Sequence, residues 1–344
     1  MKLFFHKLFR WEYWPFQIVY IPIYFLWAFY AIKARTIFFF NASNPKIKNG
    51  GFMAESKKEI YDLIPQKYYP KTELVLENND FEKVISIFEN STIQFPFIAK
   101  PDIGLRGSAV KKIHNLEELK IYNSKANFDY LIQDLIPYAN EVGIFYVRFP
   151  NEKKGKVTGI VAKEYVIIEG DGKATMEQLI RANPRYELQI ENIKKDFGTR
   201  FNEVLEKGKK LNLVPYGNHA RGAKFIDVSN LITDRLNETI DAMCQEIPEF
   251  YFGRLDIMYD SWMGLEKGKN FAIVEINGAG SEPTHIYDPK HSLFFAWKEL
   301  ARHITYMYKI SVQNHKRGFP YLEHKEGMRQ YNLHLEQSNK IVNF

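Results

Sequence analysis

Cysteine is the scarcest residue of this chain, since Cys244 is the only one among 344 residues. A single thiol excludes an intramolecular disulfide and fits a reducing compartment. The sequence also has no cluster of His and Cys with the spacing of a zinc site, no internal repeat and no motif for binding RNA or DNA. Its net charge of +6 is too diffuse to argue for nucleic acid. That charge is compatible with an anionic partner such as lipid, nucleotide or an acidic substrate.

Aromatic residues, in contrast, make up 15% of the chain, and many of them lie near its beginning. Residues 14–32 are apolar or aromatic apart from Gln17, and two prolines interrupt them. About nineteen such residues are just enough to span a bilayer. Lysines and arginines lie on both sides of the stretch, however, so they do not indicate which end would be cytoplasmic. A signal peptide is disfavoured, because Lys33 follows at once and no small-residue cleavage site is present. Three alternatives stay open: a helix in the plane of the membrane interface, which the aromatic content favours, a true span, and a helix packed on the rest of the chain.

Two predicted strands carry the most informative pattern. Arg254 and Asp256 lie two residues apart on one strand face, and Glu275 and Asn277 do the same on another. If the strands are neighbours, Asp256, Glu275 and Asn277 converge as three oxygen ligands. Such ligands suit Mg²⁺ that is also held by nucleotide phosphates, and Arg254 would lie where charge develops on a transferring group. Two ordinary strands with polar outward faces are the alternative.

This pattern resembles the ATP-grasp superfamily of ATP-dependent carboxylate–amine ligases, and in particular the G-R-x-D-x-M and E-x-N strands of D-alanine–D-alanine ligase. The resemblance extends over residues 55–310 and implies an α+β fold in which two lobes enclose ATP. It also implies that Mg²⁺ or Mn²⁺ is the metal, and that Arg254 and the backbone N–H of Gly280 stabilise an oxyanion.

A predicted phosphate-binding loop lies upstream. Lys100 ends an apolar strand, and Gly104, Gly107 and Ser108 follow it, in the order of the phosphate lid of ATP-grasp enzymes. A Lys at this place reaches phosphate as a point charge, and the glycines let backbone N–H groups approach closely. A plain hairpin is the alternative. Two lysines precede this lobe, Lys57 and Lys58, and one of them is the candidate contact to the α-phosphate or to the adenine side of ATP. The alternative is that the lysine is a solvated residue of a helix.

The segment after residue 130 resembles the linker that holds adenine and ribose in this superfamily. The resemblance places Gln133, Asp134 and Ile136 on the adenine side and Glu141 at the ribose hydroxyls. Family members often carry Glu-Lys or Glu-Glu where this chain has Gln133-Asp134, so the adenine contacts are the weaker prediction. A solvated acid at a strand start is the alternative for Glu141.

A further loop is similar to the N-x-x-x-G-G segment of glutamate ligases and cyanophycin synthetase, with Ala223 in place of the second Gly. The resemblance implies that Asn218 lies at ATP and that His219 and Arg221 are catalytic groups facing the phosphates. A structural His is the alternative. Residues 169–175 also resemble cyanophycin synthetase, but a turn followed by a helix cap is the interpretation we favour for them.

Two features depart from D-alanine–D-alanine ligase. After E-x-N the loop carries Glu282 and His285, which imply a different acceptor. The chain also has no room for that ligase's N-terminal substrate domain. We therefore expect the following organisation: 1–40, a hydrophobic membrane-associated segment; 41–90, a linker and pre-grasp region; 91–136, the small lobe; 137–310, the large lobe with the metal site; 311–344, a polar, loosely packed C-terminal tail.

The resemblance implies an ATP-dependent carboxylate–amine ligase at the cytoplasmic face of the membrane. A carboxylate attacks the γ-phosphate to give an acyl phosphate, and an amine then displaces phosphate, so the products include ADP and phosphate. Two alternatives stay open, a non-catalytic nucleotide-binding scaffold at the membrane and an ATP-grasp phosphotransferase. Neither the two substrates nor the oligomeric state follows from the sequence.

Overall fold

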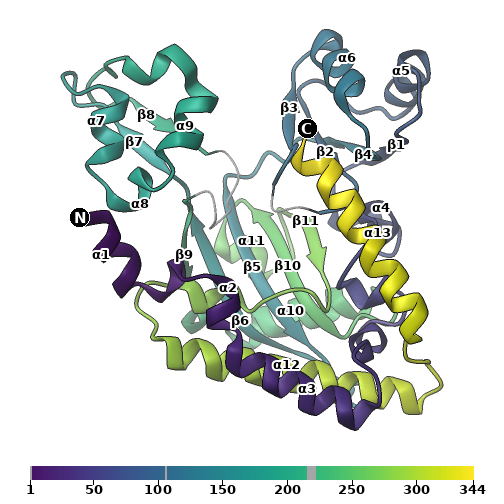
Figure 1. Ribbon diagram of the computed structural model, residues 1–344. Coiled ribbons are helices and arrows are strands. Elements are labelled where there is room, and N and C mark those ends of the chain that lie inside the picture. The colour runs from purple at the N-terminus through teal and green to yellow at the C-terminus, as the bar shows by residue number, and fades with distance from the viewer. Residues whose placement is uncertain (1, 105–106, 215–221) are drawn as a thin grey trace.

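The chain forms a central body with two smaller units above it (Figure 1). This computed structural model describes residues 2–104, 107–214 and 222–344. The body holds a five-stranded antiparallel sheet, and the two units hold a four-stranded and a two-stranded antiparallel sheet. Helices and antiparallel strands alternate along the chain, which confirms the expected α+β class.

The smaller lobe has the strand order β1-β4-β2-β3, and two helices cover its core. Both helices begin at a side-chain cap, Asp80 for the first and Asn115 for the second. The sheet includes a strand before the boundary expected at residue 91, so the lobe begins near Thr72. Its elements are β1 (Thr72–Val75), α5 (Phe81–Asn90), β2 (Phe97–Pro101), β3 (Lys111–Ile113), α6 (Leu116–Lys125) and β4 (Tyr130–Asp134).

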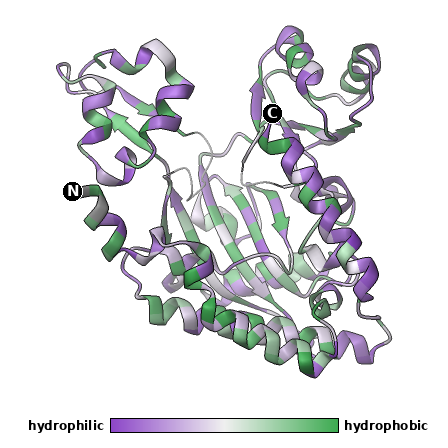
Figure 2. Cartoon of the chain, viewed as in Figure 1, coloured by the Kyte–Doolittle hydropathy of each residue, from purple (hydrophilic) through white to green (hydrophobic). Residues whose placement is uncertain are grey.

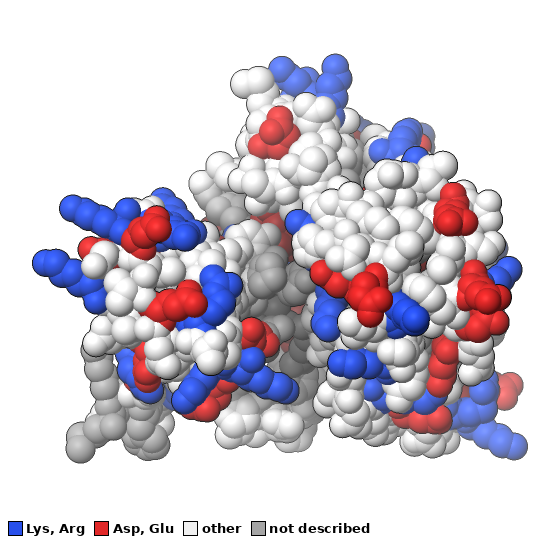
Figure 3. All heavy atoms as spheres, turned by 90° about the horizontal axis from the view of Figure 1, so that it is seen from above, with Lys and Arg blue, Asp and Glu red and all other residues white. Residues whose placement is uncertain are grey.

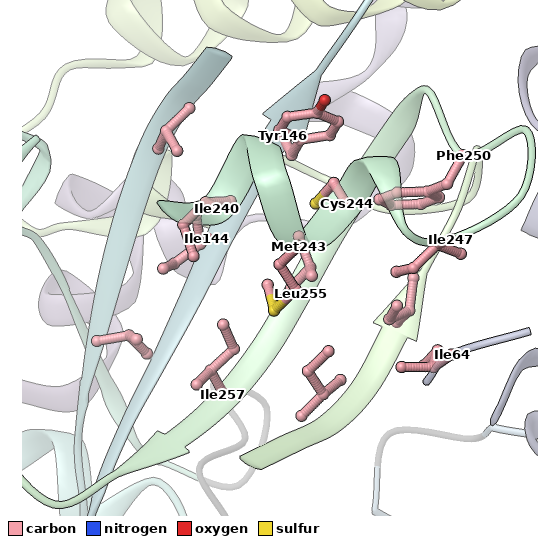
Figure 4. Close-up of a cluster of buried hydrophobic side chains, with 14 of the residues drawn as sticks. Ile64, Ile144, Tyr146, Ile240, Met243, Cys244, Ile247, Phe250, Leu255 and Ile257 are labelled. Atoms are coloured by element: carbon pink, nitrogen blue, oxygen red, sulfur yellow. The ribbon is translucent and has the colours of Figure 1, made fainter. Parts of the chain in front are cut away.

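The larger lobe has the strand order β11-β10-β5-β6-β9. Alternate residues of its strands point to helix α10, where Ile144, Leu255 and Ile257 pack with Cys244 (Figure 4). The single thiol is thus part of the core, and burial raises its pKa. The elements of this lobe are β5 (Asn140–Val147), β6 (Lys156–Glu164), β9 (Lys224–Asp227), α10 (Asp234–Gln245), β10 (Phe252–Tyr259), α11 (Trp262–Glu266) and β11 (Phe271–Asn277).

Between β6 and β9 the chain forms an insert with its own hydrophobic cluster. Its first helix begins at Thr175, whose side chain and that of Gln178 each accept a hydrogen bond from the backbone N–H of the other residue. This confirms the cap predicted after residues 169–175. The elements of the insert are β7 (Ile167–Glu169), α7 (Met176–Arg181), α8 (Pro184–Glu187), α9 (Ile190–Phe197) and β8 (Lys210–Asn212).

The N-terminal segment lies along the long helix α12 at the base of the body (Figure 1). Ile23 packs against Leu300 of that helix, and Phe39 packs against Met307. Within the described part of the chain, no helix has the length and apolarity needed to cross a membrane. The elements of this layer are α1 (Lys2–Phe9), α2 (Phe16–Val19), α3 (Ile21–Ala34), η2 (Phe39–Ser43) and α12 (Leu293–Lys316).

The side of α3 that faces away from α12 is apolar and exposed. Phe25 is 75% exposed and Ile32 is 77% exposed, and Figure 2 shows hydrophobic residues along this helix. The packed-helix alternative for residues 14–32 therefore holds for one face of the segment, and the other face is covered by none of the described residues.

The C-terminal segment differs from the expected loose tail over 311–344. Helix α12 continues to Lys316, and a further helix, α13 (His324–Val342), crosses from the body to the small lobe. Ile341 is buried in the small-lobe core, and the ring of Phe344 lies 4.9 Å from that of Tyr122. Few apolar residues suffice here because they lie at the end of the helix, where Phe344 packs on Tyr122 of α6 and on Phe128.

Candidate functional site

The two predicted polar strands are neighbours, as the sequence analysis required. Strands β10 and β11 pair antiparallel, with Asp256 opposite Glu275 and Arg254 opposite Asn277. The four side chains therefore share one face of the sheet. On the next strand, a Cβ atom at Gly143 would lie 3.1 Å from Asp256 Oδ1, so glycine leaves the space that the carboxylate uses.

Asp256 is buried between two cations. Arg254 donates from Nε to Oδ1 at 2.9 Å and from Nη2 to Oδ2 at 3.1 Å, and Lys163 Nζ lies 3.7 Å from Oδ2. Burial alone would raise the pKa of Asp256, but Arg254 and Lys163 outweigh burial and hold the pKa below its usual value. The carboxylate is therefore ionised at neutral pH.

Glu275 is held in the same way by a residue of another segment. Lys57 Nζ lies 3.0 Å from its Oε1, and the pKa of Glu275 is lowered because this cation outweighs burial. Lys57 begins α4 (Lys57–Tyr61), which Ser56 caps. The following residue, Lys58, instead pairs with Asp62 within the same helix, so the fold directs Lys57 to the site.

The loop after β2 comes down onto this ion pair. A Cβ atom at Gly104 would lie 2.5 Å from Lys57 Nζ and 3.2 Å from Glu275 Oε1. Glycine therefore allows the small-lobe backbone to approach the two charges directly. Farther along the loop, Gly107 has a φ of 80° and has no atom within 4 Å of its Cβ position, so its role is to form the turn. Ser108 follows it as a half-buried residue.

Lys100 lies in the interior of the site. Its Nζ donates to Tyr61 Oη at 2.8 Å, to Gln133 Oε1 at 2.8 Å and to the carbonyl of Val274 at 3.3 Å. Burial, and then the positive charge of Lys57, lower the pKa of Lys100 to about 7. At neutral pH this lysine is thus poised between its charged and neutral forms.

Gln133 is buried, and both ends of its side-chain amide form hydrogen bonds within the chain. Its Oε1 accepts from Lys100, and its Nε2 donates to Thr72 Oγ1 at 2.7 Å. Asp134 and Ile136 lie beyond it, half-buried, at the end of β4 and in the connection to β5. The side chain of Gln133 is therefore oriented toward Lys100 instead of being free to meet an adenine.

Glu141 is the second residue of β5 and is not a solvated acid. It forms an ion pair with Lys163 of β6 and accepts a hydrogen bond from Tyr165 Oη at 2.9 Å. Because Lys163 also contacts Asp256, it links the predicted ribose residue to the predicted metal residues. Burial would lower the pKa of Lys163, but Asp256 and Glu141 outweigh it and raise the pKa.

Sequence reasoning missed Lys163 and Tyr61. A signal for Lys163 was present, since a lysine interrupts the apolar run before Glu164 that predicts a strand. Tyr61 had no such signal, because its position on a helix gives no indication that its hydroxyl meets Lys100. Asn218, His219 and Arg221 lie outside the described residues.

The expectation for Gly280 is wrong in this structure. Its backbone N–H donates to the carbonyl of Gly51 at 2.9 Å, and the neighbouring N–H of Ala279 donates to Gly50. The loop thus pairs with the segment before α4, so its N–H is not free to meet an oxyanion. In the same loop, the carboxylate of Glu282 accepts hydrogen bonds from Tyr20 and Tyr287, which ties the N-terminal segment to the loop.

The residues present fit a divalent cation held together with a nucleotide. Asn277 Nδ2 is buried and has no hydrogen-bond partner among the residues described, so this donor suits a phosphate oxygen, while Oδ1 of the same side chain is the atom that would ligate a cation. Beside it, Asp256 and Glu275 offer two ionised carboxylates. No group of three or more His, Cys, Asp and Glu side chains in the described ranges is placed to hold a metal alone. Two carboxylates and an amide leave positions that phosphate oxygens would complete, as is usual for Mg²⁺.

Seen from above, the surface is recessed between the insert and the small lobe (Figure 3). Cations and carboxylates are interspersed on the two raised parts, with no large area of one sign. This agrees with the diffuse net charge of +6.

No family model matches the chain, and no curated protein matches it in sequence. Solved structures of three ligases are similar to it. A bifunctional glutathione synthetase from Pasteurella multocida is 12% identical, with a TM-score of 0.39, over 74% of this chain and 38% of its own. The D-alanine–D-alanine ligase from Bacillus anthracis is 12% identical, with a TM-score of 0.41, over 76% of this chain and 68% of its own. The VanG D-Ala:D-Ser ligase from Enterococcus faecalis is 14% identical, with a TM-score of 0.41, over 74% of this chain and 61% of its own.

This chain therefore spans 38% of the length of the glutathione synthetase. Likeness at these identities and TM-scores is distant, and the function of the chain has to be inferred from its own residues.

Proposed function

We propose that this chain is an ATP-dependent ligase of the ATP-grasp type, which joins a carboxylate to an amine with ATP and Mg²⁺ or Mn²⁺. The observation that carries this proposal is the convergence of three distant segments: the β10–β11 pair, Lys57 at the start of α4 and the glycine loop after β2. Buried charged groups with shifted pKa values at such a junction are typical of functional sites.

Each charged group has a role in this proposal. Asp256, Glu275 and Asn277 would hold the divalent cation, which supplies charge neutralisation for the phosphates. Lys57 neutralises Glu275 in this structure, and it would be free to bind phosphate if Glu275 held a cation instead. Lys100 gains a full positive charge when phosphate oxygens approach it.

The chemistry proposed has two steps. A substrate carboxylate attacks the γ-phosphate of ATP, and an acyl phosphate and ADP result. An amine then attacks the acyl carbon, phosphate leaves, and an amide remains. The chain's part is to position the reactants and to balance charge, with Arg254 beside the reacting centre. Because Gly280 is engaged elsewhere, Arg254 is the principal candidate for oxyanion stabilisation.

Product analysis separates this function from the two alternatives. The purified protein is incubated with ATP, Mg²⁺ and a panel of amino acids and of cell-wall and lipid precursors. A ligase releases ADP and phosphate together with an amide. A phosphotransferase gives ADP and a stable phosphorylated product. Nucleotide binding without turnover across the panel would indicate a scaffold.

We further propose that the enzyme works at the cytoplasmic face of a membrane, where ATP is present. The exposed apolar face of α3 supports this, since Phe25, Phe29 and Ile32 lie on the side away from α12. Lys33 and Arg35 end the helix and would meet anionic headgroups. Tyr20 joins this segment to the loop that carries Glu282, so a membrane contact would lie close to the acceptor side of the site.

A further inference from the structure

A cavity of about 410 Å³ lies between α1, the insert and the edge of the large sheet. This volume is within the usual range of small-molecule sites. It is distinct from the β10–β11 strands, because its walls come from α1, α8 and the ends of β6 and β9. Charged and aromatic side chains form much of its lining, among them His6, Arg10, Glu164, Tyr165, Arg185 and Lys224.

The cavity holds more positive than negative charge. Arg185 forms an ion pair with one oxygen of Glu12 at 2.7 Å, and Arg10 lies 3.9 Å from the other oxygen. Lys224 lies 3.3 Å from Glu164. Among the described residues, three cations thus share two carboxylates in this group, which leaves an excess of one positive charge. The excess favours an anion over a neutral or cationic ligand.

The pKa of His6 is lowered in part by the same positive charges. Burial lowers its pKa, and the nearby Arg10 and Arg185 lower it further. Its Nε2 is buried and has no hydrogen-bond partner within the part of the chain described. A neutral imidazole with an unmet hydrogen bond therefore lies at the edge of the cavity.

Tyr165 separates the cavity from the candidate active site. It lines the cavity, and its hydroxyl donates to Glu141 at 2.9 Å. Glu141 pairs with Lys163, which in turn contacts Asp256. A ligand in the cavity would thus lie one side chain away from the charged network of the large sheet.

We propose that this cavity binds the phosphate group of a small anionic ligand, with Arg10, Arg185 and Lys224 as its partners. Guanidinium groups bind phosphate oxygens through two parallel hydrogen bonds, and a lysine adds a point charge. The volume leaves room for a substituent on the phosphate. The neighbouring α1 exposes Leu8 and Phe9, so the phosphate has two possible sources, a soluble molecule or a lipid headgroup. The site goes beyond the proposed ligase activity and exists whether or not that proposal holds.

Inorganic pyrophosphate is the probe for the first source. It is titrated into the full-length protein by calorimetry in EDTA, so that no divalent cation can recruit it to the carboxylates of β10 and β11. Lys224→Gln removes a half-exposed cation and should weaken binding about tenfold, which is about 1.4 kcal/mol. Glu164→Gln removes the competing carboxylate and should strengthen binding. Lys210→Gln, at an exposed lysine of the insert, is the matched control and should change nothing.

Vesicles of phosphatidylcholine with phosphatidic acid are the probe for the second source. If the headgroup is the ligand, Lys224→Gln should reduce retention of the protein on these vesicles, and Lys210→Gln should not. The proposal is supported by either probe when the Lys224 and Glu164 variants shift its binding in opposite directions. It is overturned if neither probe binds, or if both variants bind as the unaltered protein does. None of these results depends on ATP turnover, so the ligase proposal is tested separately.

Discussion

Lys100 holds its ammonium group in a buried position, among the hydroxyl of Tyr61, the amide of Gln133 and a backbone carbonyl. Burial is the main reason that its pKa falls to about 7. Bound phosphate would favour the charged form, and the pKa would then rise. ATP binding should therefore take up a proton when the pH is above about 7.

The prediction is that affinity for ATP falls as the pH rises from 7 to 9, and that Lys100→Ala binds more weakly and loses most of this dependence. Calorimetry in buffers of different ionisation enthalpy measures both the affinity and the proton uptake. Lys58→Ala is the control, because Lys58 pairs with Asp62 in its own helix. An unchanged affinity and pH profile in Lys100→Ala would remove Lys100 from the phosphate site.

The same pKa shift predicts a pH-dependent stability. Lys100 has a lower pKa in the folded than in the unfolded chain, so the unfolded chain binds more protons between pH 7 and 10. The contribution of this residue to the free energy of unfolding should therefore rise with pH in that window. Urea denaturation at pH 7 and pH 9 measures how the free energy of unfolding changes with pH in the unaltered protein and in Lys100→Met. An equal change in both proteins would contradict the lowered pKa of Lys100.

Some roles at the residue scale followed from sequence, and others did not. Period-2 alternation was enough to place Arg254 with Asp256 on one face of a strand, and Glu275 with Asn277 on one face of another. That these two strands pair, with Asp256 opposite Glu275, was an assumption that the structure bears out. Tyr61 and Lys163 depend on how separate elements meet, which local patterns do not report. The prediction for the N–H of Gly280 was wrong for the same reason, since the carbonyl that accepts its hydrogen bond lies on a segment more than two hundred residues earlier.

At the scale of elements, α3 has two apolar faces with different surroundings. One packs on α12 through Ile23, and the other exposes Phe25 and Ile32. Amphipathic analysis could not separate these faces, because hydrophobic residues occur all round the helix. Deletion of α3 would also remove buried residues such as Ile23 and Ala31, so substitutions on the exposed face are the better test.

The double variant Phe25→Ser and Ile32→Ser should bind anionic vesicles at least tenfold more weakly and keep its thermal stability. The reason is that each large apolar side chain contributes about 1.5–3 kcal/mol when it leaves water. Vesicle co-sedimentation measures the partition. Val204→Ser, at an exposed apolar residue of the insert, is the control. Equal partition of both variants would count against the membrane face.

Helix α13 shows why the C-terminal segment was predicted incorrectly. Its composition is polar because most of its surface is exposed, and only its end inserts into the small lobe through Ile341 and Phe344. Lys340 adds an ion pair with Glu77 at 3.0 Å. A short apolar anchor at the end of a polar helix gives little signal in the sequence, although it joins two parts of the fold.

Phe344→Ala should lower the free energy of unfolding by about 1–3 kcal/mol, because it removes ring contacts with Tyr122 and Phe128. Urea denaturation measures the change. Val342→Ala is the control on the same turn, since Val342 is 66% exposed. If the two variants are equally stable, the helix end does not anchor the lobe.

At the scale of the whole molecule, the candidate site exists only because several units meet. The large sheet supplies the carboxylates, α4 supplies Lys57, and the small lobe supplies Lys100 and the loop with Gly104. Helix α13 joins the body to the small lobe, where Ile341 and Phe344 pack in the core of that lobe. The ligase proposal therefore depends on the assembled chain, and its central element is a divalent cation that the carboxylates of Asp256 on β10 and Glu275 on β11 would hold.

ATP binding with and without Mg²⁺, compared between the unaltered protein, Glu275→Gln and Asp256→Asn, tests that element most directly. With saturating Mg²⁺, both variants should bind ATP at least tenfold more weakly, about 1.4 kcal/mol, because each lacks a charged ligand. In EDTA the two variants should bind ATP as tightly as the unaltered protein or more tightly, since without a cation the carboxylates only repel the phosphates. Glu169→Gln, at an exposed acid of the insert, should match the unaltered protein throughout. Equal Mg²⁺-dependent affinity in all four proteins would contradict the account.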